Sequence, residues 1–157
     1  MNGTDVLLGV IDDAYSGKSW QGSNLKGSIR GLSTKEAAWR PGFDRHNIWE
    51  LVMHAAYWKY SVKRRLLNEK RGSFPFKGSN WFVRPQEWTD AAWKTDLRLL
   101  DALHQGLRRA VASLDPSILD KTIPGGKYSY AKIVYGVAAH DVYHTGQINL
   151  IKRLMRS

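Results

Sequence analysis

The stretch that decides the fold is Ser129–Met155, with the sequence SYAKIVYGVAAHDVYHTGQINLIKRLM. One residue in every three or four belongs to a single stripe, which predicts a helix from Ser129 to about Met155: Ile133, Val137, His140, His144, Gln147, Ile151 and Leu154. Three successive members of this stripe are polar, although aliphatic residues flank them on both sides. Buried polar groups destabilise a protein unless each has a partner, so this part of the helix is expected to carry a site.

Three other stretches of the 157-residue chain show helical periodicity: Thr4 to about Tyr15, about His46 to Asn68, and about Thr89 to Leu114. A weaker helical continuation covers residues 25–32, and a short capped turn at residues 33–36 is followed by Pro41-Gly42. Residues 70–88 form a long loop rich in Gly, Pro and aromatic residues, which is typical of a segment that covers a site. No stretch gives a strand signal. The sequence therefore predicts an all-α protein, a single-domain four-helix bundle.

His140 and His144 lie one helical turn apart, so their side chains project the same way and can share one metal ion. A third ligand is expected from a facing helix, where His54 lies among small and apolar residues. Three neutral imidazoles with open coordination positions describe a catalytic type of site. The chain has no cysteine, which favours a nitrogen-preferring divalent ion such as Zn²⁺, Ni²⁺ or Fe²⁺. The alternative is that His140 and His144 are core residues bonded to buried hydroxyls such as those of Tyr143 or Tyr57.

The two remaining histidines are expected to behave differently from each other. His104 lies in the apolar stripe of the third long helix, so it is either a third or fourth ligand or a core histidine with its own partners. His46 stands at the start of the second long helix and is expected to face solvent or to cap that helix.

Two further polar residues are candidates for a catalytic role. Glu50 lies one turn before His54, where its carboxylate could be a fourth ligand, an acceptor for a ligand histidine, a general base or an exposed salt-bridge partner. Gln147 lies one turn beyond the second histidine of the pair and could orient a bound water molecule or substrate. Asp141 points about 100° away from the preceding histidine on a helix, so it is poorly placed to ligate the same ion.

Two segments resemble a known family. Residues 45–59, RHNIWELVMHAAYWK, look like the first metal-ligand helix of the DinB-like (DinB/YfiT) metal-dependent enzymes, and residues 140–148, HDVYHTGQI, are similar to that family's H-x-x-x-H-x-G-Q signature. The resemblance covers essentially the whole chain. It implies a four-helix bundle of up-down-down-up topology, often dimeric, with a divalent metal on His54, His140 and His144. Some members resemble thiol-dependent transferases and isomerases, in which the metal activates the thiol of a small cofactor.

The formal net charge is +10, from 24 Lys and Arg against 14 Asp and Glu, which favours anionic partners. Much of this charge is expected to be solvated at helix ends, where cations complement the helix dipole: Lys59, Lys63, Arg64, Arg65, Lys70 and Arg71, and then Lys152, Arg153 and Arg156. The apolar runs are too short for a transmembrane helix, and the N-terminus does not resemble a signal peptide. A cytoplasmic protein is therefore expected.

These features favour two functions of different class. The first is a metal-dependent enzyme of transferase or hydrolase type, in which a tri-His metal activates a thiol or water and the small-molecule substrate is anionic. The substrate pocket is expected to be shaped by aromatic residues: Trp58, Trp81 and Tyr143, together with Phe82 and Trp88. The second is a non-enzymatic basic module that binds nucleic acid or senses a metal or ligand. Nucleic acid is the less favoured partner, because the aromatic residues lie in apolar stripes and one loop.

Overall fold

The computed structural model describes all 157 residues, and it is built from helices and loops. The helices are α1 (Gly3–Tyr15), α2 (Leu25–Ile29), α3 (Thr34–Ala38), α4 (Ile48–Leu66), α5 (Asp90–Ala112) and α6 (Tyr130–Arg156), and a short 3-10 helix covers Pro116–Ile118. The predicted all-α fold is confirmed, and each of the four long helices begins and ends within two residues of its expected bounds. None of the helices combines the length and the apolar character needed to cross a membrane.

Short polar motifs fix where the helices begin. At α4, the side chain of Asn47 accepts a hydrogen bond from the backbone N–H of Glu50 at 2.8 Å, and the Glu50 carboxylate accepts one from the backbone N–H of Asn47 at 3.3 Å. The same reciprocal capping box begins α1 and α3. Such caps satisfy backbone N–H groups that have no partner within the helix.

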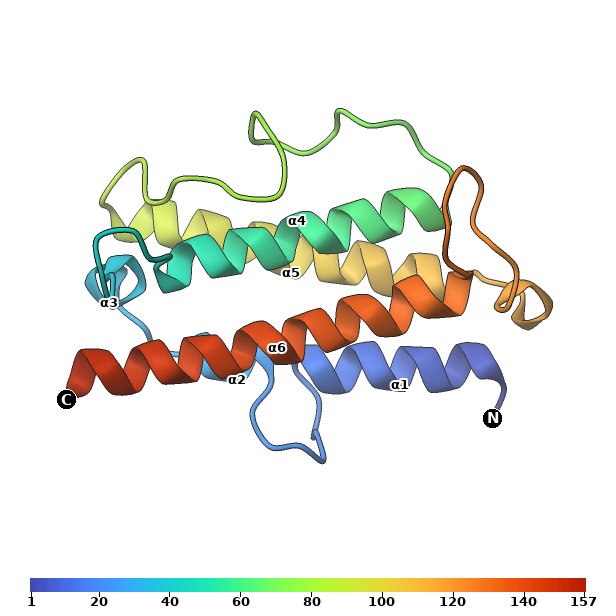
Figure 1. The fold of residues 1–157 in the computed structure, drawn as a ribbon, viewed down its shortest axis with the longest axis horizontal. Helices are drawn as coiled ribbons and strands as arrows, with labels where there is room; N and C mark the ends of the chain where they lie inside the picture. Colours follow the sequence, from blue (N-terminus) through green and yellow to red (C-terminus); the bar gives the residue numbers. More distant parts are fainter.

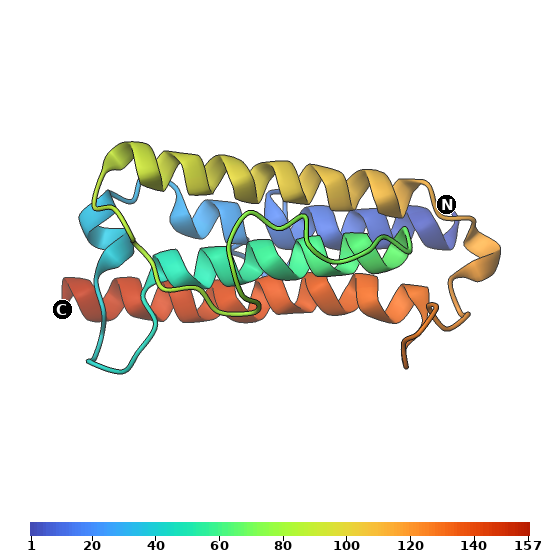
Figure 2. The same ribbon diagram turned by 90° about the horizontal axis from the view of Figure 1, so that it is seen from above.

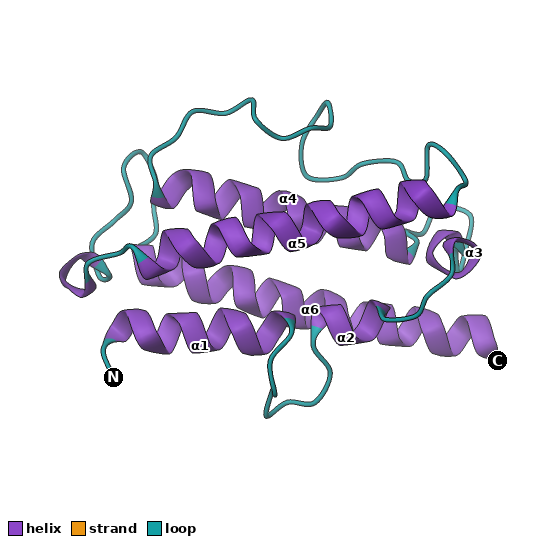
Figure 3. Cartoon of the chain, turned by 180° about the vertical axis from the view of Figure 1, so that it is seen from behind, coloured by secondary structure: helices purple, strands orange, loops and turns teal.

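The four long helices lie side by side with nearly parallel axes (Figure 1). Following the chain in Figure 1, α1 and α6 run in one direction, whereas α4 and α5 run in the other. The view from behind shows α5 in front of α4 and α1 in front of α6, with the short α2 continuing the line of α1 (Figure 3). α4 packs against both α5 and α6, so side chains of α4 and α6 can meet inside the bundle.

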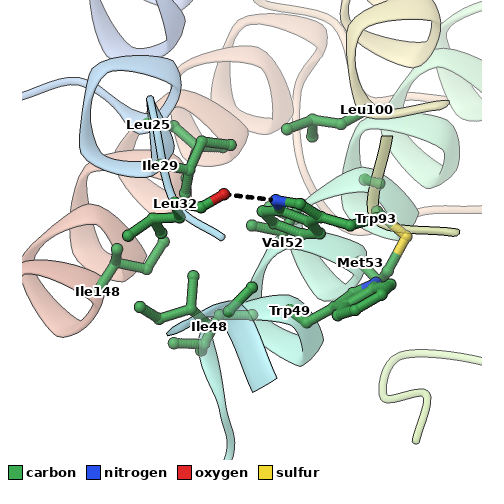
Figure 4. Close-up of a cluster of buried hydrophobic side chains, with 14 of the residues drawn as sticks. Leu25, Ile29, Leu32, Ile48, Trp49, Val52, Met53, Trp93, Leu100 and Ile148 are labelled. Carbon is green, nitrogen blue, oxygen red and sulfur yellow. Dashed lines mark hydrogen bonds between the residues drawn. The ribbon is translucent and has the colours of Figure 1, made fainter. Parts of the chain in front are cut away.

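A hydrophobic core fills the end of the bundle near α2 and α3 (Figure 4). Its largest members come from α4 and α5, where Trp49 and Trp93 pack with their ring centroids 5.0 Å apart. The indole N–H of Trp93 donates to the backbone carbonyl of Leu32 at 3.1 Å, drawn as the dashed line in Figure 4. A second core surrounds Leu107 and Val134 at the other end. Polar residues occupy much of the α4–α6 contact between the two cores, and they form the site described below.

The loop of residues 67–89 runs back along the outside of the bundle (Figures 1 and 2). Because α4 and α5 run in the same direction, the chain must return over the full length of α4 before α5 begins. A 19-residue helix is roughly 28 Å long, which explains why the connection is long. The loop passes over the middle of α4 on this path, so it can contribute residues to the α4–α6 contact.

Candidate metal centre

Three histidine side chains from two helices converge on one point. The Nε2 atom of His140 lies 3.0 Å from Nε2 of His54 and 3.0 Å from Nε2 of His144. One ring nitrogen of each residue lies within 4.8 Å of the others. His54 and His144 are buried and His140 is half-buried. The structure therefore brings together the three residues that the sequence predicted as ligands.

The outer nitrogens of two of these rings are held by hydrogen bonds. His54 Nδ1 lies 2.8 Å from the backbone carbonyl of Asn80, which can only accept, so Nδ1 carries the proton and Nε2 presents a lone pair. His144 Nδ1 lies 2.6 Å from Oε1 of Gln147, and the Gln147 amide N–H₂ donates to the Tyr143 hydroxyl at 3.3 Å. An outer hydrogen bond that fixes the tautomer and the ring orientation is typical of metal-ligating histidines.

Burial keeps all three imidazoles neutral. It is the main cause that lowers the pKa of His54 from 6.5 to about 4 and that of His140 to about 3, with repulsion from the neighbouring imidazolium forms adding to it. Burial also lowers the pKa of His144, although the hydrogen bond to Gln147 acts in the opposite direction. At neutral pH the rings therefore offer lone pairs rather than positive charge.

The residues present fit a divalent cation. With Nδ1 protonated on His54 and His144, two lone pairs face Nε2 of His140 at 3.0 Å, and a proton on that atom could satisfy only one of them well. His140 Nδ1 is buried without a hydrogen-bond partner, so neither tautomer of this ring satisfies the cluster. A cation at the centre would use all three lone pairs at once. Nitrogens around a tetrahedral Zn²⁺ at ~2.0–2.1 Å are roughly 3.4 Å apart, close to the 3.0 Å separations found here.

Trp81 covers the cluster from the loop. Its ring stacks on His54 with centroids 3.8 Å apart and on His46 with centroids 3.7 Å apart, both nearly parallel. His46 is exposed, as expected, but the N-cap of α4 is Asn47. Trp81 therefore connects a surface histidine to a candidate ligand and shields one face of the His54 ring.

Glu50 is buried at 4 % exposure and is not the exposed salt-bridge partner considered from the sequence. Its two oxygens accept hydrogen bonds from Arg40 at 2.6 and 2.8 Å, from His46 at 3.2 Å and from the backbone N–H of Arg84 at 3.2 Å. Burial alone would raise the pKa of Glu50, but these hydrogen bonds lower it below its ordinary value. The carboxylate is not among the groups around the histidines, and it instead joins α4 to the segments that precede and follow it.

Two cavities border the histidine cluster, where the sequence suggested one. The larger, about 530 Å³, includes Arg45, His144 and four residues predicted to lie at the site or beside it: His46, Trp81, Tyr143 and Gln147. The smaller, about 390 Å³, includes His54, His140, Trp58 and Arg65. We refer to them as the Arg45 cavity and the Arg65 cavity.

Two aromatic residues of the loop do not line these cavities. Trp88 is 67 % exposed, and Phe82 is buried among the aromatic residues of the loop and α4. The expectation that Trp88 and Phe82 shape the substrate pocket is therefore wrong. Both follow Trp81 in a segment that has already passed the cluster on its way to α5, which explains why they lie elsewhere.

A buried polar network lies next to the cluster. Lys59, expected at a solvated helix end, is 1 % exposed, and its ammonium group donates to Asp141, also 1 % exposed. Its Nζ also lies 3.3 Å from Nδ1 of His104, whose ring stacks on Tyr15 at 3.8 Å. His104 is thus a core histidine with its own partners and not a metal ligand. Asp141 points away from the cluster, as its helical position predicted, and ends in the ion pair.

The sequence did not indicate Asn80, which acts on the site in two ways. Its backbone carbonyl orients His54, and its side-chain Oδ1 accepts a hydrogen bond from the indole N–H of Trp58 at 2.9 Å. Its φ of +68° lies in the left-handed region, which Asn tolerates better than most residues. A backbone carbonyl has no sequence signature, and the only signal was the turn-like run Gly78-Ser79-Asn80.

The fold and the site define a helical bundle with a candidate metal centre of three imidazoles. The model of the DinB superfamily matches residues 19–148, a segment that includes all three histidines. The chain belongs to the DinB superfamily. No curated protein and no solved structure gave a significant match.

Proposed function

We propose that this DinB superfamily protein is a divalent-metal-dependent enzyme that activates a thiol or a water molecule for group transfer or hydrolysis. The observation that carries the proposal is the convergence of three Nε2 atoms while the outer nitrogens of His54 and His144 are held by hydrogen bonds. Three protein ligands leave coordination positions open, as in catalytic zinc sites.

The chain's own residues would prepare the site before any ion arrives. The Asn80 carbonyl and Gln147 hold two ligand rings in the tautomer that directs Nε2 inward. The lowered pKa values keep those lone pairs free of protons at neutral pH, so a metal ion would not have to compete with protons. When bound, such an ion supplies Lewis acidity, which lowers the pKa of a coordinated thiol or water toward neutrality.

Gln147 and Glu50, the two catalytic candidates, are proposed to act through other residues. Gln147 fixes the ring of His144 and also lines the Arg45 cavity, so it can meet a substrate there. Glu50 holds Arg40 and the backbone of Arg84, and so fixes the loop that carries Trp81. Both are therefore assigned as positioning residues.

The test is elemental analysis of the untagged protein beside two variants. His144→Ala should lose the metal and any turnover together while keeping its helical circular dichroism. His104→Gln also removes a buried imidazole, but one outside the cluster, and should keep the metal. A near-stoichiometric divalent metal in the parent and in His104→Gln supports the assignment, and thiol-transfer and hydrolase substrates are then screened in that order. Metal retained by His144→Ala would contradict it.

A further inference from the structure

The two cavities lie on either side of the histidine cluster, along the line where α4 and α6 pack together. The Arg45 cavity is lined by the first turn of α4 and the C-terminal half of α6, from Tyr143 to Leu154. The Arg65 cavity is lined by the middle and end of α4 and by the N-terminal half of α6, from Ile133 to His140. A centre held by the three imidazoles is therefore bordered by two separate cavities.

The Arg65 cavity has room for an organic molecule. Its volume of about 390 Å³ falls in the range of ordinary ligand pockets, roughly 300–1,000 Å³. Gly136 helps to keep it open, because a Cβ atom added there would have no heavy atom within 4 Å. Water alone would not need a cavity of this size.

One end of this cavity carries a cation without a partner. The guanidinium of Arg65 makes neither an ion pair nor a hydrogen bond, although the side chain is half-buried. By contrast, Arg84 is paired with Asp96, and Arg45 in the other cavity lies 3.5 Å from Asp44. An unpaired, partly desolvated guanidinium is a strong receptor for a carboxylate, which it can bind in bidentate fashion.

The remaining walls favour an apolar body. Trp58 and Tyr128 contribute aromatic surface, and the other apolar lining residues are aliphatic: Val62, Ile133 and Val137. The indole N–H of Trp58 is already donated to Asn80, so the ring presents only apolar surface. The far end of the cavity is formed by His54 and His140. A ligand anchored at Arg65 would thus extend toward two of the three candidate metal ligands.

We propose that the Arg65 cavity is a second ligand site, which binds a small organic monocarboxylate with an apolar body and presents its far end to the imidazole cluster. This inference rests on the proposed function, because it assigns one of two reactants to a metal centre. The Arg45 cavity remains free for the other reactant. The arrangement favours transfer between two organic molecules over simple hydrolysis.

The site can be tested by direct binding of 3-phenylpropionate, with 3-phenylpropan-1-ol as the uncharged probe of the same shape. Both are titrated by calorimetry into protein of measured metal content. Arg65→Met keeps the length of the side chain and removes its charge. It should weaken 3-phenylpropionate by about 10- to 100-fold, as expected for a lost charge-assisted hydrogen bond, and change the alcohol by less than about threefold. Arg45→Met is the matched control from the other cavity and should leave both probes within about threefold.

Filling the cavity gives a second, independent measurement. Gly136→Leu should abolish binding of both probes, whereas Gly136→Ala should keep it and preserve the fold if the larger side chain disturbs the helix. Equal affinity of the carboxylate for the parent and Arg65→Met would overturn the proposal, and so would a loss confined to Arg45→Met. Because metal content is measured in the same samples, a parent without metal would count against the proposed function, while dependence of binding on Arg65 would still establish the carboxylate site.

Discussion

Replacing Lys59 by Met removes one half of the most deeply buried ion pair and leaves Asp141 charged in the core. Both side chains are 1 % exposed, and Oδ1 of Asp141 has no hydrogen-bond partner even with Lys59 in place. Breaking such a pair from one side costs about 3–5 kcal/mol of unfolding free energy, because the remaining charge is uncompensated. At roughly 2–4 °C per kcal/mol for a chain of this size, Tm should fall by about 10 °C.

The penalty should depend on pH in a defined direction. Burial raises the pKa of Asp141, and Lys59 opposes that rise, so in Lys59→Met the carboxyl should take up a proton more easily in the folded state. The folded variant then binds more protons than the unfolded chain at pH values above the ordinary pKa of an aspartate. Its unfolding free energy, relative to the parent, should therefore recover as the pH is lowered toward ~4.

The assay is urea unfolding of metal-free protein, followed by circular dichroism, for both single variants and the double variant Lys59→Met/Asp141→Val. The double variant removes both charges, so it should regain most of the stability lost in Lys59→Met. Effects of the two single substitutions that simply add in the double variant would refute the reasoning, because they would show that the two groups do not compensate each other's charge.

Three further outcomes are expected. Gln147→Ala should weaken metal binding by roughly 10–100-fold in competition with a chelator, because the ligand imidazole it orients loses its acceptor, while Asn149→Ala on the same helix should not. Metal-free protein should lose stability in urea as the pH falls below 6.5, because the pKa of His140 is lowered to about 3 and the unfolded chain binds the extra proton; a urea midpoint that stays constant from pH 7.5 to 5 would contradict this. Trp49→Phe should cost about 2–4 kcal/mol in thermal unfolding, because a buried indole donates to Asp96 at 2.6 Å; a loss below about 1 kcal/mol would contradict this.

Helical periodicity determined most of the fold. Each long helix carries its own apolar stripe and polar cap, such as Asn47 before α4, and these signals are local in sequence. Local signals survive without knowledge of the tertiary structure, so the helix bounds could be predicted to within two residues. The i and i+4 spacing of His140 and His144 is equally local, which is why the site could be located at all.

Packing decided the roles of the charged residues. Lys59 lies four residues before the basic run at the end of α4, and the sequence does not distinguish it from Lys63. Only the position of α6 places Asp141 opposite Lys59 and so makes its burial tolerable. Glu50 likewise has no sequence signature of burial, since its partners Arg40 and Arg84 come from segments before and after α4.

The sequence by itself determined the all-α fold and the three candidate ligands, because helical phase and imidazole spacing are properties of neighbouring residues. Only the tertiary structure decided which groups orient those ligands and how the surrounding space is divided. The shared direction of α4 and α5 forces the loop across α4, and this path alone brings the Asn80 carbonyl to His54. The two cavities exist because α4 and α6 meet at the cluster, a contact between residues more than 80 positions apart in the chain.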